Sequence, residues 1–264
     1  MRPGAAASPP MPGGDWPSGP QYLYGITTSS AGVPPGLHGT GHPAGRVVLL
    51  RHGAIAAIIS SVRADQPLGT PADARAHAHV LAVMAEAASV LPMRFGAVMT
   101  DGAAIVAELL IPHHDTLAAA LARLDGHQQF TIKGKYIGQA ALREVLAAEP
   151  EVMRLRRLLA GREIDAYSRE SIRLGELVAS ALERKRMADL QILVGALQPH
   201  AAALAPRAPS AADDAVDAAF LVLRRQRPAF EQAAEELARH WRSRIRLRLL
   251  GPLAPYDFSG TLPG

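Results

Sequence analysis

Short apolar runs typical of β-strands recur along the chain, and those at residues 21–27 and 128–133 alternate with a two-residue period. They cover residues 21–27, 47–50, 55–59, 128–133 and 218–223. In the first run, Tyr22, Tyr24 and Ile26 share one predicted face. The second and third runs are joined by a short link that contains Gly53, which predicts a β-hairpin.

Helical periodicity fills most of the space between these runs. The first helix has a clear start, with Thr70 as N-cap, Pro71 at the first helical position and Asp73 completing a cap-like pair. Apolar residues then recur at three- and four-residue steps and predict one buried face: Ala76, Val80, Val83, Ala87 and Val90. His77 and His79 are two positions apart, so they point in different directions and we expect both to be partly exposed.

Later helices and strands complete an α+β pattern in two domains. Helices are predicted at residues 103–110, 116–124, 140–159, about 165–197 and from 228 onward. Residues 21–138 are interpreted as an N-terminal ferredoxin-like sandwich and residues 139–258 as a helix-extended, ferredoxin-like α+β domain. Residues 1–20 are rich in Pro, Gly, Ala and Ser, which predicts a disordered tail, and residues 259–264 form a short second tail.

The segment at residues 91–96 lies between two helical runs. We expect Pro92 to end the preceding helix, since its ring clashes with the preceding turn. Met93 and Phe95 alternate with Arg94, which predicts a short strand with both apolar side chains in the core. Arg94 then lies on a solvated face, pairs with a nearby carboxylate, or contacts a partner.

Composition sets the class of protein. Hydrophobic residues make up 48% of the 264 and aromatic residues only 5%, so the expected core is aliphatic. The absence of cysteine excludes disulfides and thiolate chemistry. No apolar run approaches the roughly 20 residues that span a bilayer, and no secretory signal is evident, so we expect a soluble cytoplasmic protein.

The sequence contains no recognisable catalytic motif. Gly39-Thr40-Gly41 is followed by neither a lysine motif nor a helix, so it is not interpreted as a phosphate-binding loop. The histidines lack the spacing of metal ligands, and we expect neither an enzyme nor a metal or nucleotide cofactor. Near the end, arginines alternate with apolar residues and predict a strand with one basic face: Arg242, Arg244, Arg246 and Arg248. That face is either an exposed sheet edge or a surface for anions or nucleic acid.

Four stretches also resemble a known family. Residues 91–96, Leu-Pro-Met-Arg-Phe-Gly, are similar to the "LP-hydrophobic-RFG" signature of the gas vesicle protein L/F family. Residues 22–26 and 53–60 resemble two strands of that family, and residues 251–258 resemble its closing "GPWPPYSF". The chain departs from the pattern at Leu253, Ala254 and Asp257. It also has His127, Gln128 and Gln129 in the strand where the family often has a Glu.

The resemblance implies an accessory protein of gas vesicle assembly, and hence a role in buoyancy. Its implied partners are the small hydrophobic shell protein and other accessory proteins, met through an added strand or an apolar patch. The implied location is the gas vesicle in the cytoplasm. Candidate partner-binding residues are Arg94, Tyr24 and Tyr256. The alternative function is a regulatory module that binds nucleic acid through the arginine-rich strand.

Overall fold

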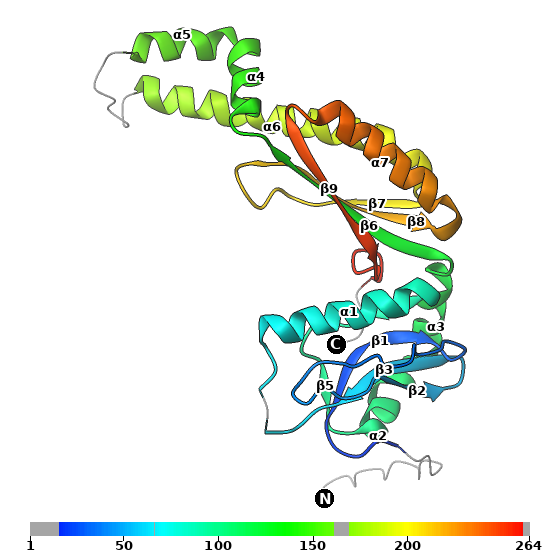
Figure 1. Ribbon diagram of the computed structural model, residues 1–264. Helices are drawn as coiled ribbons and strands as arrows, with labels where there is room; N and C mark the ends of the chain where they lie inside the picture. Colours follow the sequence, from blue (N-terminus) through cyan, green and yellow to red (C-terminus); the bar gives the residue numbers. More distant parts are fainter. Residues whose placement is uncertain (1–15, 66, 161–168, 261–264) are drawn as a thin grey trace, which may run out of the picture.

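The chain forms two antiparallel sheets covered by helices (Figure 1), and the computed structural model describes residues 16–65, 67–160 and 169–260. The N-terminal sheet has the strand order β2-β3-β1-β4, with β5 also paired to β1. Its strands are β1 (Gln21–Thr28), β2 (Val48–His52), β3 (Ile55–Ser61), β4 (Val90–Pro92) and β5 (Val98–Met99). The β2–β3 ladder confirms the predicted hairpin.

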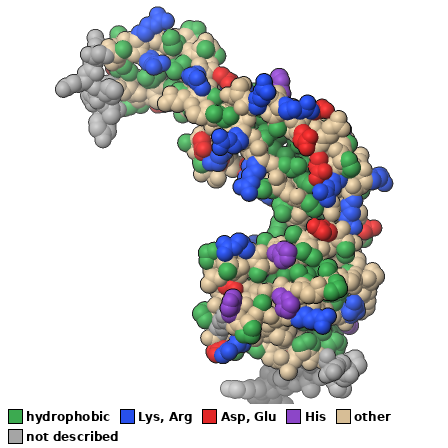
Figure 2. Space-filling view, in the orientation of Figure 1, with side chains coloured by type: hydrophobic (Ala, Val, Ile, Leu, Met, Phe, Trp, Pro, Cys, Tyr) green, Lys and Arg blue, Asp and Glu red, His purple; other side chains and the backbone are tan. Residues whose placement is uncertain are grey.

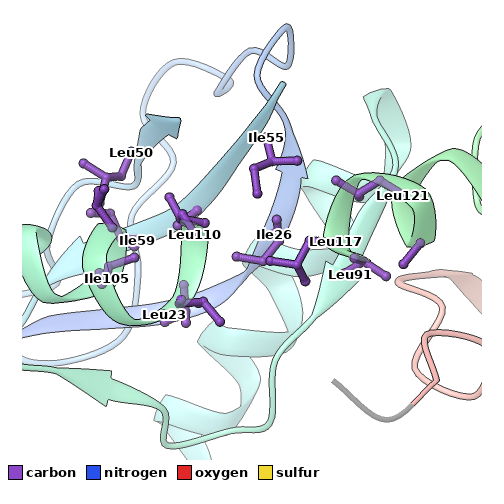
Figure 3. Packing of buried hydrophobic residues seen from close by; sticks show 14 of the residues in the cluster. Leu23, Ile26, Leu50, Ile55, Ile59, Leu91, Ile105, Leu110, Leu117 and Leu121 are labelled. Atoms are coloured by element: carbon purple, nitrogen blue, oxygen red, sulfur yellow. The ribbon is translucent and has the colours of Figure 1, made fainter. Parts of the chain in front are cut away.

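Helices cover both faces of the N-terminal sheet. Helix α1 (Pro71–Ala87) packs on one face and starts with the predicted capping box of Thr70 and Asp73. The opposite face packs against α2 (Gly102–Ala104), the π-helix η1 (Ile105–Leu110) and α3 (His114–Arg123). Figure 3 shows the aliphatic core on that second face, with side chains of β1, β3 and the helices interlocked. The sheet is thus a central layer with two separate cores.

The C-terminal sheet has the strand order β7-β8-β6-β9. Its strands are β6 (His127–Tyr136), β7 (Ala203–Pro206), β8 (Asp214–Leu223) and β9 (Ile245–Leu253). Helices α6 (Arg169–Leu197) and α7 (Arg227–Trp241) pack on one face of this sheet. Helices α4 (Ala140–Ala148) and α5 (Pro150–Leu159) pack on the far part of α6, and together they form an arm that projects beyond the sheet (Figure 1). The C-terminal half also contains two short 3-10 helices, η2 (Gln198–His200) and η3 (Arg224–Gln226).

A buried ion network fixes the arm to the C-terminal sheet. Asp189 of α6 is fully buried and accepts a hydrogen bond from the Tyr136 hydroxyl at 2.7 Å. Arg244 pairs with Asp189 and also with Glu144 of α4, at 3.1 Å for the latter pair. Lys185 adds a contact of 2.6 Å to Glu144. Its alternation with Arg246 and Arg248 predicted that Arg244 would be part of an exposed basic face. That prediction is wrong, because Arg244 is a structural residue of this network.

The two halves meet along α1. Arg224, which follows β8, donates through Nη2 to the carbonyl oxygens of Ala85 and Ala88 at 3.0 and 3.1 Å. These carbonyls lie at the C-terminal end of α1, where a cation is favourable. After β9 the chain passes back over α1, and Ala254 is buried in the core beneath that helix. Figure 1 shows α1 between the N-terminal sheet and the descending end of β9.

The structure corrects the placement of one strand. We predicted residues 128–133 as part of the N-terminal domain, but β6 pairs with β8 on one side and β9 on the other. Phe130 and Ile132 do point inward, as predicted, but into the C-terminal core. The α+β class with two antiparallel sheets is confirmed, and the description as two ferredoxin-like domains stays a prediction.

Two local predictions at the faces of β1 and α1 are also wrong. A β-bulge between Leu23 and Gly25 shifts the register of β1, so Ile26 packs on the α3 side, away from Tyr22 and Tyr24. In α1, we expected His77 to be partly exposed, but its exposed fraction is 3%. The buried face of α1 follows the line through Asp73, His77, Val80, Leu81, Met84 and Ala85.

The predicted disordered tail falls largely on residues 1–15, which lie outside the described residues. Within the described part, Trp16 packs against the N-terminal core and the Pro17 carbonyl accepts from the Gly102 N–H at 2.9 Å. Residues 16–20 are thus ordered against the domain. No single helix of the described chain is long and apolar enough to cross a membrane, and one bent pair, Gly102–Leu110 with His114–Arg123, passes by length and composition only.

Candidate partner-binding site

The candidate site starts from the buried carboxylate of Asp73 in the first turn of α1. Its Oδ2 accepts from the Thr70 hydroxyl at 2.7 Å and from the backbone N–H groups of Gly69 and Thr70 at 3.2 and 3.0 Å. Its Oδ1 accepts from the Thr40 hydroxyl at 2.9 Å. The hydrogen bond from the Thr70 side chain is the main reason that the pKa of Asp73 lies well below its usual range. Asp73 therefore ties the start of α1 to the loop after β1.

His77 lies one turn further along the same face of α1 and joins two tyrosines. Its Nδ1 is 3.0 Å from the Tyr22 hydroxyl, and its Nε2 is 2.9 Å from the Tyr256 hydroxyl. A neutral imidazole satisfies both contacts in either tautomer, because one nitrogen donates and the other accepts. Burial lowers the pKa of His77 below its ordinary 6.5. The ring is thus held neutral between β1 and the C-terminal segment.

Tyrosines from β1 hold the histidine ring in place. Tyr24 stacks on His77 with ring centroids 5.7 Å apart, and its hydroxyl contacts Ser60 Oγ at 2.8 Å. The Tyr24 hydroxyl also accepts from the Thr40 N–H at 2.7 Å. Gly39 is required beside it, since a Cβ there would lie 2.0 Å from the Tyr24 hydroxyl oxygen. Tyr24 is fully buried, so it supports the site and does not present a surface to a partner.

Burial also changes the acidity of the tyrosines. It raises the pKa of Tyr22 to about 12, although a hydrogen bond from the Gly96 N–H opposes the shift. Burial likewise raises the pKa of Tyr24 and of Tyr256. All three hydroxyls therefore stay protonated near neutral pH, and the cluster carries no charge apart from Asp73.

Two aromatic side chains that contact this buried cluster are exposed at the surface. Phe95 is 40% exposed and Tyr256 is 45% exposed. The Phe95 ring lies 5.7 Å from His77 and 6.3 Å from Tyr22, measured between centroids. The rim formed by Phe95 and Tyr256, which we call the aromatic rim, is thus an exposed apolar surface backed by a rigid hydrogen-bonded layer.

The aromatic rim includes a turn that the sequence pattern misassigns. Strand β4 ends at Pro92, which lies in the strand and does not end a helix. Phe95 is in a turn closed by Gly96 at φ +94°, where glycine is favoured. We predicted the Phe95 side chain in the core, but it is exposed. Met93 does pack against the core. Arg94 is exposed in the same turn and forms no ion pair with any residue in the described ranges.

Of the three predicted site residues, Tyr24 and Tyr256 both contact His77, and Arg94 lies beside Phe95. His77 is the functional candidate that the sequence analysis missed. The available signal was its spacing of four residues from Asp73, which puts both polar groups on one helix face.

The adjacent histidine pair of the sequence, His113 and His114, does not form a metal site with a third ligand from the part of the chain that the structure describes. His114 Nδ1 lies 2.9 Å from Asp115, and its Nε2 accepts from the Ala54 N–H at 3.3 Å. Within residues 16–65, 67–160 and 169–260, no group of three or more His, Asp or Glu side chains could hold a metal ion.

Comparisons with known proteins place most of the chain in one family. The family model of the gas vesicle synthesis protein GvpL/GvpF matches residues 20–260. Gas vesicle protein F of Streptomyces sp. (strain CB03234) is 32% identical over 90% of this chain and 98% of its own length. Gas vesicle protein L of the same strain is 30% identical over 91% of this chain and 92% of its own length.

Solved structures agree with the fold. The crystal structure of the gas vesicle protein GvpF from Microcystis aeruginosa has a TM-score of 0.76 at 25% identity, covering 92% of this chain and 100% of the other. The GvpF structure from Anabaena sp. PCC7120 has a TM-score of 0.78 at 24% identity, covering 92% and 99%. None of these comparisons supports the nucleic-acid alternative.

Proposed function

The chain belongs to the gas vesicle synthesis protein GvpL/GvpF family, and we propose that it is an accessory protein of gas vesicle assembly that contacts the small hydrophobic shell protein. The aromatic rim of Phe95 and Tyr256 is the observation that carries this proposal. Other accessory proteins of the vesicle are further partners in the same proposal. The protein acts in the cytoplasm, at the gas vesicle.

An apolar shell subunit before assembly needs a surface that covers its exposed side chains. Phe95 offers a large apolar face, and Tyr256 offers an apolar ring whose hydroxyl is already bonded to His77. Binding there removes apolar area from water without leaving a polar group unpaired. Arg94, next to Phe95, adds an exposed cation at the edge of the same surface.

The role is binding and not catalysis. A catalytic acid, base or nucleophile needs a pKa tuned toward the working pH. The tyrosine pKa values here move away from neutrality, and each hydroxyl of Tyr22, Tyr24 and Tyr256 is engaged by a neighbour. The cluster is arranged as a stiff support and needs no metal or nucleotide cofactor.

We also propose that the two sheets are the cores of two domains. The C-terminal half has the connectivity strand, helices, two strands, helix, strand, in the order β7-β8-β6-β9, which supports a ferredoxin-like domain. The boundary then lies between α3 and β6 and not at residues 138–139. The N-terminal sheet has the same kind of order, with the loop at residues 29–47 in place of its first helix.

The test is capture of purified shell protein by Phe95→Ala, compared with wild type and with a matched control. Ile192→Ala is the control, because Ile192 is 49% exposed on α6, far along the chain from the rim. We expect Phe95→Ala to fold, as judged by circular dichroism, and to lose most of its capture, while Ile192→Ala binds as wild type does. Unchanged capture by folded Phe95→Ala would refute the proposal.

A further inference from the structure

Strand β9 is a long, open edge of the C-terminal sheet. The strand order β7-β8-β6-β9 leaves one side of β9 without a strand partner. β9 has nine residues, whereas β7 at the other edge has four and ends in Pro206. Native sheets usually keep such edges short or blocked, because an unpaired edge is a template for another strand.

The ladder with β6 shows which backbone groups face outward. The Ile137 N–H donates to the Arg244 carbonyl at 2.9 Å, so residues 137 and 244 form a hydrogen-bonded pair. Because these pairs alternate along an antiparallel ladder, Arg246 and Arg248 also bond to β6. The N–H and C=O groups of Ile245, Leu247 and Leu249 then point away from β6, toward the open edge.

The two arginines of β9 lie opposite lysines. Arg248 faces Lys133 and Arg246 faces Lys135 across the ladder. Directly opposed like charges destabilise a sheet. The lysines are compensated from β8 and its preceding loop, with Lys133 at 3.2 Å from Asp217 and Lys135 at 3.0 Å from Asp213.

The arginines have no such compensation. Both Arg246 and Arg248 are exposed, and neither forms an ion pair with any residue that the structure describes. Figure 2 shows Lys and Arg side chains on the hollowed side of the C-terminal half. An additional strand beside β9 would place its own side chains directly against these two guanidinium groups.

The other face of β9 is apolar. Ile245 is buried and Leu247 is partly buried in the core under the helices, while Leu249 is 36% exposed. We propose that the β9 edge accepts an extended segment of another protein in which acidic residues alternate with apolar ones. The acidic residues would pair with Arg246 and Arg248, and the apolar residues would extend the core beside Leu247 and Leu249.

A second copy of this chain is a poor occupant. Two β9 strands paired edge to edge would bring the unpaired arginines of both copies onto one small surface, and like charges disfavour such a contact. The proposed site is also separate from the aromatic rim, since it uses other residues on the other sheet. The inference therefore does not depend on the shell-protein proposal.

The test uses a fluorescent nine-residue peptide of alternating valine and glutamate, with a valine–lysine peptide as the charge control, and fluorescence anisotropy as readout. We expect the acidic peptide to bind in a salt-dependent manner and the basic peptide not to bind. The double variant Arg246→Glu/Arg248→Glu should weaken binding by about tenfold or more. Arg242→Glu, an exposed arginine in the turn after α7, is the matched control and should bind as wild type does.

Strand addition is separated from simple ion pairing by the backbone. Leu249→Pro removes an N–H that points outward and leaves the hydrogen bonds to β6 intact, so it should abolish binding while preserving circular dichroism. In hydrogen exchange, the peptide should protect the amides of Ile245, Leu247 and Leu249. Failure of the acidic peptide to bind would show that the arginines only guard the edge, and would overturn the proposal. Full binding by Leu249→Pro, or equal binding of single-stranded DNA, would overturn it as well.

Discussion

Replacement of His77 by glutamine should remove a pH dependence of stability that the buried imidazole imposes. In the folded protein the ring is 3% exposed and bonded through both nitrogens to Tyr22 and Tyr256. The groups that face it are tyrosines, which stay protonated, and Asp73, which stays ionised to low pH. Within this cluster, His77 is thus the group whose protonation changes as the pH falls below its ordinary pKa of 6.5.

The sign follows from the lowered pKa. The unfolded chain binds a proton at His77 near its ordinary 6.5, whereas the folded protein binds it only at lower pH. Between these two pKa values the unfolded state holds more protons, so the free energy of unfolding increases with pH. The contribution is complete above the unfolded pKa and is lost as the pH falls below it. Its slope cannot exceed about 1.4 kcal/mol per pH unit for one proton.

The assay is urea unfolding of wild type and His77→Gln at a series of pH values from about 5 to about 8. Above the unfolded pKa the variant should be less stable by about 1–2 kcal/mol, because glutamine cannot keep both hydrogen bonds. That difference should shrink as the pH falls through 6 or so. The two stability curves share every other titrating group, so parallel curves over the whole range would refute the reasoning.

Three more substitutions test the structure. Asp189→Asn removes a fully buried charge that pairs with Arg244, and urea unfolding should show a loss of about 2–4 kcal/mol; a loss below about 1 kcal/mol would contradict the buried network. Gly39→Ala places a methyl group 2.0 Å from the Tyr24 hydroxyl oxygen and should cost about 1–3 kcal/mol in thermal or urea unfolding. Gly32→Ala is the matched control, because Gly32, like Gly39, has no positive φ but has open space around it, and it should change stability by less than about 0.5 kcal/mol. Arg94→Ala should change stability by about 0–0.5 kcal/mol, and capture of the shell protein then decides whether this exposed cation takes part in binding.

Sequence signals predicted those helix and strand boundaries that depend on contacts between residues a few positions apart. The capping box of Thr70 and Asp73 marked the start of α1, and the link that contains Gly53 marked the β2–β3 hairpin. The sequence could not show that Asp73 also reaches Thr40, because that contact joins residues 33 positions apart. His77 was misjudged for the same reason, since its burial depends on Tyr256, 179 positions away.

Two residues that depart from the family pattern, Gln129 and Asp257, contact each other in the structure. Gln129 lies in the segment where the resembling family pattern often has a Glu, and Asp257 stands where the closing motif of that pattern has Ser. In the structure the Gln129 amide donates to the Asp257 carboxylate at 2.6 Å, and the Asp257 N–H donates back to Gln129 Oε1 at 3.1 Å. Arg207 also pairs with Asp257. Asp257, in the segment after β9, thus joins that segment to Gln129 of β6 and to Arg207.

The position of the turn that presents Phe95 follows from how the residues on either side of it pair with β1. Residues 90–92 pair with β1 beyond its bulge, and residues 98–99 pair with β1 before it. The Met93 N–H bonds to the Tyr24 carbonyl at 2.8 Å and the Leu23 N–H bonds to the Ala97 carbonyl at 2.9 Å, so the three residues between them have no place in the ladder.

Those three residues must leave the sheet, and Gly96 allows the required turn, with its N–H bonded to the Tyr22 hydroxyl at 2.9 Å. The same Tyr22 hydroxyl contacts His77, which holds Tyr256. The break between β4 and β5 therefore places Arg94 and Phe95 outside the sheet, with Phe95 against the ring system that anchors the C-terminal segment. The alternation of apolar and polar residues predicted a strand here. That pattern contains no information about which residues pair with β1, and this pairing leaves Arg94 and Phe95 exposed outside the core.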